Sequence, residues 1–106
     1  MLRVTALLLA VATSTAQEEP RMVFGPMGFS CGKWTNAREQ TGERAQLRYW
    51  ILGYLSGLNM ESSTDFLRGR DIDGLIGWID NYCRRNPLDT MVRAVHELRD
   101  ELRSGR

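Results

Sequence analysis

Three stretches of the chain repeat apolar residues with the period of an α-helix. In residues 42–59 the apolar positions recur three and four residues apart, so they share one face of a helix. They are Leu47, Trp50, Ile51, Tyr54, Leu55 and Leu58. Thr41 is the predicted N-cap and Asn59 the predicted end of this helix. The pattern predicts a long helix with one apolar face turned toward a core.

The second stretch covers residues 72–86. Its apolar face consists of Ile72, Leu75, Ile76, Ile79, Tyr82 and Cys83. Asp71 is the predicted N-cap, because an aspartate side chain accepts hydrogen bonds from the unpaired amides of a first turn. Arg84 and Arg85 lie in the last turn, where the helix dipole favours positive charge.

The third stretch is predicted to form a helix over residues 87–103, with Asn86 as N-cap and Pro87 in the first helical position. Its apolar face consists of Leu88, Met91, Val92, Val95, Leu98 and Leu102. On the polar side, Asp89–Arg93 and Arg93–Glu97 are spaced four residues apart, as in helical ion pairs.

The remaining segments are shorter. Residues 60–71 form a predicted connection, from which Phe66 and Leu67 can cover the core. A short helical turn is plausible from Ser30. Residues 17–29 contain two prolines and two glycines without a period, which predicts an extended, flexible N-terminal arm.

Gly53 and Gly57 stand four residues apart inside the first helix. Two glycines in a helix interior cost about 1 kcal/mol each relative to alanine. We expect close packing of a neighbouring helix backbone as compensation; the floor of a binding groove is the alternative. Membrane dimerisation is excluded by the charged residues of the same segment, Glu43, Arg44 and Arg48.

The first 16 residues have the pattern of a secretory signal peptide. Arg3 precedes an apolar run over residues 4–12, and Ser14 and Ala16 have the spacing of a cleavage site. We predict cleavage after Ala16, with a weaker alternative at Ala10 and Ala12. The predicted organisation is a signal peptide (1–16), the arm (17–29), a helical domain (30–103) and a tail (104–106), in a protein exported to the periplasm or secreted.

Export would place Cys31 and Cys83, the only cysteines, in an oxidising compartment, where we predict a disulfide between them. A metal site would need about four ligands. A catalytic thiol would need a base, for which His96 is the only candidate. In the chain-entropy model, a disulfide closing so long a loop stabilises the fold by roughly 4 kcal/mol.

Composition and net charge limit the size of the fold and the kinds of partner. The chain has 106 residues, 42% hydrophobic and 25% charged, which is typical of one globular domain. Its formal net charge of +1 gives no strong field for nucleic acid or an anionic membrane. We therefore expect no nucleic-acid binding. We also expect no membrane span, because the apolar run over residues 4–12 is shorter than the roughly 20 residues that a spanning helix needs.

Catalytic chemistry is not indicated. His96 is interpreted as a surface or boundary histidine. Asp71 and Asp73, with Glu61 and Asp65 upstream, lack the ligand spacing of a calcium loop and read as capping residues. We expect no enzyme activity, no cofactor and no metal.

Five large aromatic residues could either fill the core or line a surface for a partner; core packing is favoured. They are Trp34, Trp50, Tyr54, Trp78 and Tyr82.

The segments "YWILGYLSGLN" and "DGLIGWIDNYCRRNPLDTMVRAVHEL", preceded by a signal peptide and an early cysteine, resemble the HdeA-like group of small periplasmic helical proteins. The resemblance covers about residues 31–102. The three apolar faces and this resemblance both predict an all-α domain, a bundle of three main helices stapled by Cys31 and Cys83, and leave a short fourth helix open. The group includes acid-stress chaperones and immunity proteins that block secreted amidases.

Two functions follow as hypotheses. The first is an acid-stress holdase chaperone for unfolded clients. The second is an inhibitor or immunity protein that binds a secreted effector or a cell-wall hydrolase. A structural envelope role and a homodimer are left open.

Overall fold

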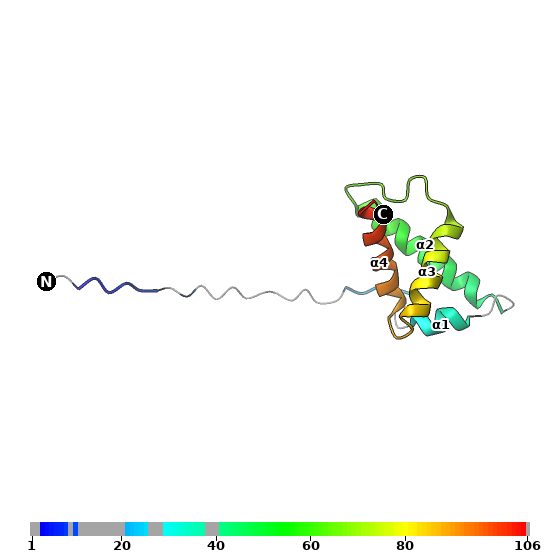
Figure 1. Cartoon of the computed structure of the whole chain (residues 1–106), viewed down its shortest axis with the longest axis horizontal. Coiled ribbons are helices and arrows are strands. Elements are labelled where there is room, and N and C mark those ends of the chain that lie inside the picture. The colour runs from blue at the N-terminus through cyan, green and yellow to red at the C-terminus, as the bar shows by residue number, and fades with distance from the viewer. Residues whose placement is uncertain (1–2, 9, 11–20, 26–28, 38–40, 106) are drawn as a thin grey trace.

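The computed structural model describes residues 3–8, 10, 21–25, 29–37 and 41–105 (Figure 1). Four helices follow one another: α1 (Cys31–Asn36), α2 (Glu43–Glu61), α3 (Ile72–Arg85) and α4 (Met91–Arg103). Within the described residues the only β-structure is an isolated bridge between Ser30 and Thr90. α4 packs against the other three helices, and α1 also packs against α3. The predicted all-α fold is confirmed, with α1 as the short fourth helix.

Part of the predicted N-terminal organisation lies outside the described residues. Residues 3–8 form no helix and are exposed. The predicted cleavage sites at Ala12 and Ala16, and residues 17–20 and 26–28 of the predicted arm, are not among the described residues. The signal peptide therefore stays a prediction.

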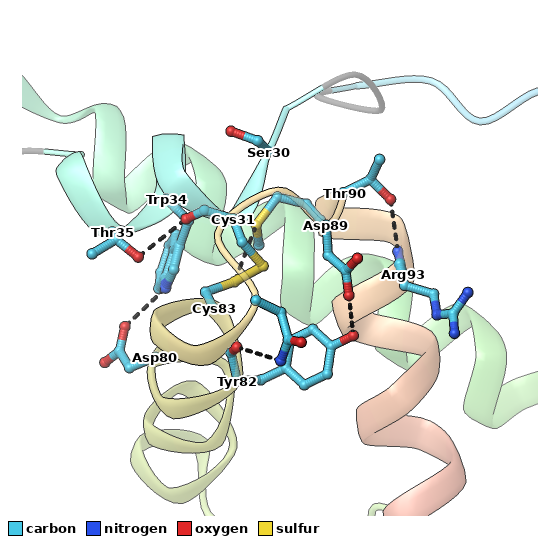
Figure 2. The surroundings of a disulfide bond; sticks show 12 residues. Ser30, Cys31, Trp34, Thr35, Asp80, Tyr82, Cys83, Asp89, Thr90 and Arg93 are labelled. Carbon is cyan, nitrogen blue, oxygen red and sulfur yellow. Dashed lines mark hydrogen bonds between the residues drawn. A yellow bond between two sulfur atoms is a disulfide. The ribbon is translucent and has the colours of Figure 1, made fainter.

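The disulfide between Cys31 and Cys83 is present and joins α1 to α3 (Figure 2). Both cysteines are fully buried, at the point where the start of α1 meets the last turns of α3. The amides of Cys31 and Gly32 also donate to the carbonyls of Asp89 and Pro87, at 2.7 and 2.9 Å. The disulfide and these backbone bonds together hold the start of α1 against the turn between α3 and α4.

Trp34 fixes the rest of α1. Its side chain is fully buried, and its Nε1 donates to Oδ1 of Asp80 on α3 at 2.8 Å (Figure 2). The guanidinium of Arg44 lies over the Trp34 ring, 4.1 Å from its centroid, and pairs with the same Asp80 oxygen at 2.8 Å. One half-buried carboxylate therefore connects α1, α2 and α3.

The core follows the predicted apolar faces closely. It contains Leu47, Ile51 and Leu55 of α2, Leu75, Ile76, Ile79 and Cys83 of α3, and Met91, Ala94, Val95, Leu98 and Leu102 of α4. Phe66 is also buried and Leu67 is partly buried, so the prediction that this connection covers the core is confirmed. Ile72 and Val92 are exceptions, because Ile72 is 49% exposed at the start of α3 and Val92 is only partly buried, whereas Ala94, which the prediction left out, is fully buried.

Two predicted helix starts are wrong. α2 is capped by Gly42, whose φ of 75° lies in the left-handed region that favours glycine, and not by Thr41. α4 begins at Met91 with Thr90 as its N-cap, and not at Pro87 with Asn86 as the cap. The reason is tertiary: the carbonyls of Pro87 and Asp89 accept from the amides at the start of α1, so this segment forms a turn. Leu88 is 94% exposed as a result.

Asp89 also has a different partner from the predicted one. The Tyr82 hydroxyl donates to the Asp89 carboxylate (Figure 2). Burial, together with this hydrogen bond and the carboxylate charge, raises the pKa of Tyr82 to about 12. The predicted Arg93–Glu97 pair is confirmed, at 3.0 Å.

Gly53 and Gly57 do not pack against another helix, so that prediction is wrong. Both are exposed, and a Cβ built at either position would meet no atom within 4 Å. α2 contacts the core through Leu47, Ile51 and Leu55, and the two glycines lie away from that face.

Replacing these glycines by alanine is therefore expected to stabilise the fold. Gly53→Ala and Gly57→Ala should each raise the free energy of unfolding by about 0.5–1 kcal/mol, because alanine loses less backbone entropy in a helix. Urea denaturation measures the change. Gly42→Ala is the control and should destabilise, because its φ is positive. A loss of stability at position 53 or 57 would contradict the open environment described here.

Candidate functional site

A cavity of about 440 Å³ opens between the first turns of α3 and the last turns of α4. α3 and α4 are joined by a short turn, so the N-terminal end of α3 lies beside the C-terminal end of α4 (Figure 1). The cavity is lined by Gly69, Arg70, Asp71, Gly74, Leu75, Trp78, Leu98, Glu101 and Leu102. Its volume lies within the usual range of ligand sites, about 300–1,000 Å³.

The floor of the cavity is apolar. Leu75, Leu98 and Leu102 belong to the buried core and also line the cavity. Trp78 forms a wall; its ring stacks on Tyr82 with centroids 5.3 Å apart and planes inclined by 12°. A flat aromatic wall beside three leucines is suited to an apolar side chain or ring.

The rim of the cavity is charged. Asp71 acts as the predicted N-cap of α3, since its Oδ1 accepts from the amide of Gly74 at 2.6 Å. Arg70 and Glu101 carry opposite charges at the same rim. Neither side chain makes a hydrogen bond or ion pair with any residue that the structure describes.

The predicted aromatic residues do not form one surface. Trp34 is a core residue held by Asp80, and Trp78 with Tyr82 stands beside the cavity. Trp50 and Tyr54 stack on α2, 5.2 Å apart. Of the five, only Trp78 lines the cavity.

Trp50 and Tyr54 form a second cluster with His96 of α4. The Tyr54 and His96 rings stack at 5.6 Å, and the Tyr54 hydroxyl lies 2.8 Å from His96 Nε2. Trp50 Nε1 donates to the carbonyl of Phe24 at 3.0 Å, which attaches residues 21–25 to α2. His96 is thus a boundary histidine, as the sequence predicts.

His96 should make the fold sensitive to mild acid. Burial lowers its pKa below 6.5, with Arg99 and Arg93 adding to the effect against Asp100 and Glu97. Because the unfolded chain binds this proton more readily, the stabilisation is present above pH 6.5 and is lost as pH falls through the folded pKa.

The chain has one histidine, so a single imidazole resonance reports the titration by NMR. We expect its midpoint below 6.5 in the folded protein and near 6.5 in urea. Tyr54→Phe keeps the stacked ring but removes the hydroxyl, and it separates the hydrogen bond from burial. A folded midpoint at or above 6.5 would contradict this arrangement.

Metal binding and membrane insertion find no support in the described part of the chain. No group of three or more His, Cys, Asp or Glu side chains there could hold a metal ion. None of the helices described is both long and apolar enough to cross a bilayer.

The sequence predicts part of this site. Leu75, Leu98 and Leu102 belong to the predicted apolar faces, and Trp78 is one of the predicted aromatic candidates. Arg70 and Glu101 are missed, because charged residues on helix ends and turns carry no signal that distinguishes a rim from an ordinary solvated surface.

Comparison with known proteins identified no relative of this chain. No family model matches the chain, and no similar protein was found among the curated proteins or the solved structures.

Proposed function

We propose that this is an exported protein that binds a protein partner in its folded, disulfide-bonded state. The observation that carries the proposal is the cavity between α3 and α4, with an apolar floor, an aromatic wall and two rim charges that lack partners among the described residues. Binding energy at protein interfaces is concentrated where a large side chain fills such a pocket. The buried disulfide is compatible with export.

The proposed activity is that of an inhibitor or immunity-type protein. Its partner is a secreted effector or a cell-wall hydrolase, in line with the HdeA-like resemblance. In this role the protein acts by covering a surface of the partner, and its own side chains perform no chemistry.

Site-specific photo-crosslinking tests the proposal. The crosslinker p-benzoylphenylalanine replaces Arg70 at the cavity rim, and in a control it replaces Arg103, which is exposed outside the cavity. We expect a discrete crosslinked protein from position 70 and little from position 103. Equal products from both positions, or none from either, would reject binding at the cavity.

The crosslinked protein is then purified and its affinity measured. Trp78→Ala should weaken binding by at least about tenfold, because an aromatic contact is lost. Trp50→Ala is the matched control, since Trp50 is also partly buried but does not line the cavity. Circular dichroism establishes that both variants are folded.

An acid-stress holdase is the second candidate, and one feature favours it. Several contacts between helices use carboxylates, above all Asp80, which holds both Trp34 and Arg44. The pKa of Asp65 is lowered, chiefly by a hydrogen bond from Asn59, so this contact is present above the unfolded pKa and weakens as acid titrates the carboxylate. Acid thus weakens a contact between the end of α2 and the connection that leads to α3.

Client aggregation decides between the two candidates. At roughly pH 2 to 3, below most carboxyl pKa values, a holdase suppresses aggregation of an acid-denatured client at stoichiometric amounts. A folded-state partner-binding protein does not, and it retains its affinity at neutral pH. Suppression in acid without any neutral-pH partner would favour the holdase.

A further inference from the structure

The cavity rim brings the ends of two antiparallel helices together, and their electrostatic signs differ. The N-terminal end of a helix carries a partial positive charge and the C-terminal end a partial negative charge. Arg70 stands just before α3, on the positive side, and Glu101 stands in the last turn of α4, on the negative side. Each charged side chain therefore adds to the partial charge of the helix end beside it.

These two charges do not neutralise each other. Arg70 and Glu101 both line the cavity, yet they form no ion pair with one another. Asp71, also at the rim, uses Oδ1 to cap α3. The rim therefore presents both a charged donor and a charged acceptor beside the apolar floor.

A matching occupant has three parts. An apolar side chain, of the size of phenylalanine, fits the floor of Leu75, Leu98 and Leu102 and contacts the Trp78 ring. An acidic group meets the guanidinium of Arg70, whose planar fork suits a carboxylate. A basic group meets the Glu101 carboxylate.

We infer that the cavity binds a segment of a partner protein in which one aromatic or large aliphatic residue has an acidic residue and a basic residue as neighbours. The inference rests on the proposed function and specifies which partner surface the cavity recognises. Charge complementarity selects and orients the segment, while the apolar residue supplies most of the affinity.

Short blocked peptides test this chemistry on the full-length oxidised protein. The probe is an acetylated and amidated tripeptide, glutamate–phenylalanine–lysine. The comparison peptides are glutamine–phenylalanine–glutamine and glutamate–alanine–lysine. The readout is the NMR shift of the Trp78 indole N–H, assigned with Trp78→Phe. For a ligand of this size we expect a dissociation constant of about 1 mM.

The peptides should differ in a defined order. Removing both charges should weaken binding roughly tenfold, since two exposed ion pairs are lost. Replacing phenylalanine by alanine should weaken it by more than about tenfold, because the buried apolar area is lost.

Variants test the two rim charges separately. Arg70→Gln and Glu101→Gln should each weaken binding of the charged peptide roughly threefold and leave the affinity for the uncharged phenylalanine peptide unchanged. Arg103→Gln and Glu61→Gln are matched controls outside the cavity and should have no effect. None of the four changes removes a buried contact, so the fold should be retained.

Two results would overturn the inference. Equal binding of the charged and uncharged phenylalanine peptides would reject the charge pattern, and absence of any shift at Trp78 would reject the apolar anchor. Neither result alters the crosslinking test, which uses the whole partner. Failure of the proposed function would appear there as loss of selective crosslinking at position 70.

Discussion

Reduction of the Cys31–Cys83 disulfide is expected to lower the free energy of unfolding by about 4 kcal/mol. The two cysteines are 52 residues apart, so the bond closes a loop that includes α2 and most of α3. In the chain-entropy model a loop of this length removes much of the freedom of the unfolded chain. The loss is large relative to the 5–15 kcal/mol typical of a whole domain.

Urea denaturation with and without reductant measures this effect. The double variant Cys31→Ala with Cys83→Ala should resemble the reduced wild type and should not respond to reductant. That variant separates loss of the bond from side effects of the reductant. An unchanged midpoint after complete reduction would show that the hydrogen bonds from Cys31 and Gly32 to the α3–α4 turn suffice to hold α1.

Trp34→Ala is expected to lower the free energy of unfolding by about 3–5 kcal/mol, the usual range for deleting a buried large aromatic side chain. Trp34 is fully buried, and its ring also supports the guanidinium of Arg44. The substitution leaves a cavity under α1, and Asp80 loses the hydrogen bond that it accepts from Trp34 Nε1. α1 has six residues and is too short to persist without its tertiary contacts.

Thermal or chemical unfolding measures this change, and two variants refine it. Trp34→Phe keeps most of the ring packing but loses the hydrogen bond, so it should cost less than Trp34→Ala. Tyr49→Ala is the control; that residue is 75% exposed and its removal should change stability by less than about 0.5 kcal/mol. A small effect of Trp34→Ala would mean that α1 contributes little to the core.

The stability losses caused by removal of the disulfide and by Trp34→Ala should not be additive. Cys31 and Trp34 both attach α1 to α3, so loss of either one releases part of what the other stabilises. A variant lacking the disulfide and Trp34 should therefore lose less stability than the sum of the separate losses.

The apolar floor of the candidate site could be predicted from the sequence, and its charged rim could not. Leu98 and Leu102 follow the helical period of α4, so their burial is predictable from spacing alone. Arg70 and Glu101 are ordinary charged residues in the sequence. Their relation appears only when the antiparallel pairing of α3 and α4 places them around the same cavity.

The sequence by itself determined the three long helical segments and most of the residues that form the core. It also determined the disulfide pairing, since only two cysteines are present, and the capping of α3 by Asp71. These features depend on spacing within one segment or on a single possible pairing. Local stereochemistry and the burial of apolar area are sufficient to specify them.

The tertiary structure alone decided where α4 begins, which face of α2 is exposed and where the cavity lies. α4 starts at Met91 because the carbonyls of Pro87 and Asp89 bond to α1, a segment more than fifty residues earlier. Gly53 and Gly57 face open space, since no atom lies within 4 Å of a Cβ built at either position. Each outcome depends on which segments meet in space, and the local spacing of residues carries no information about that.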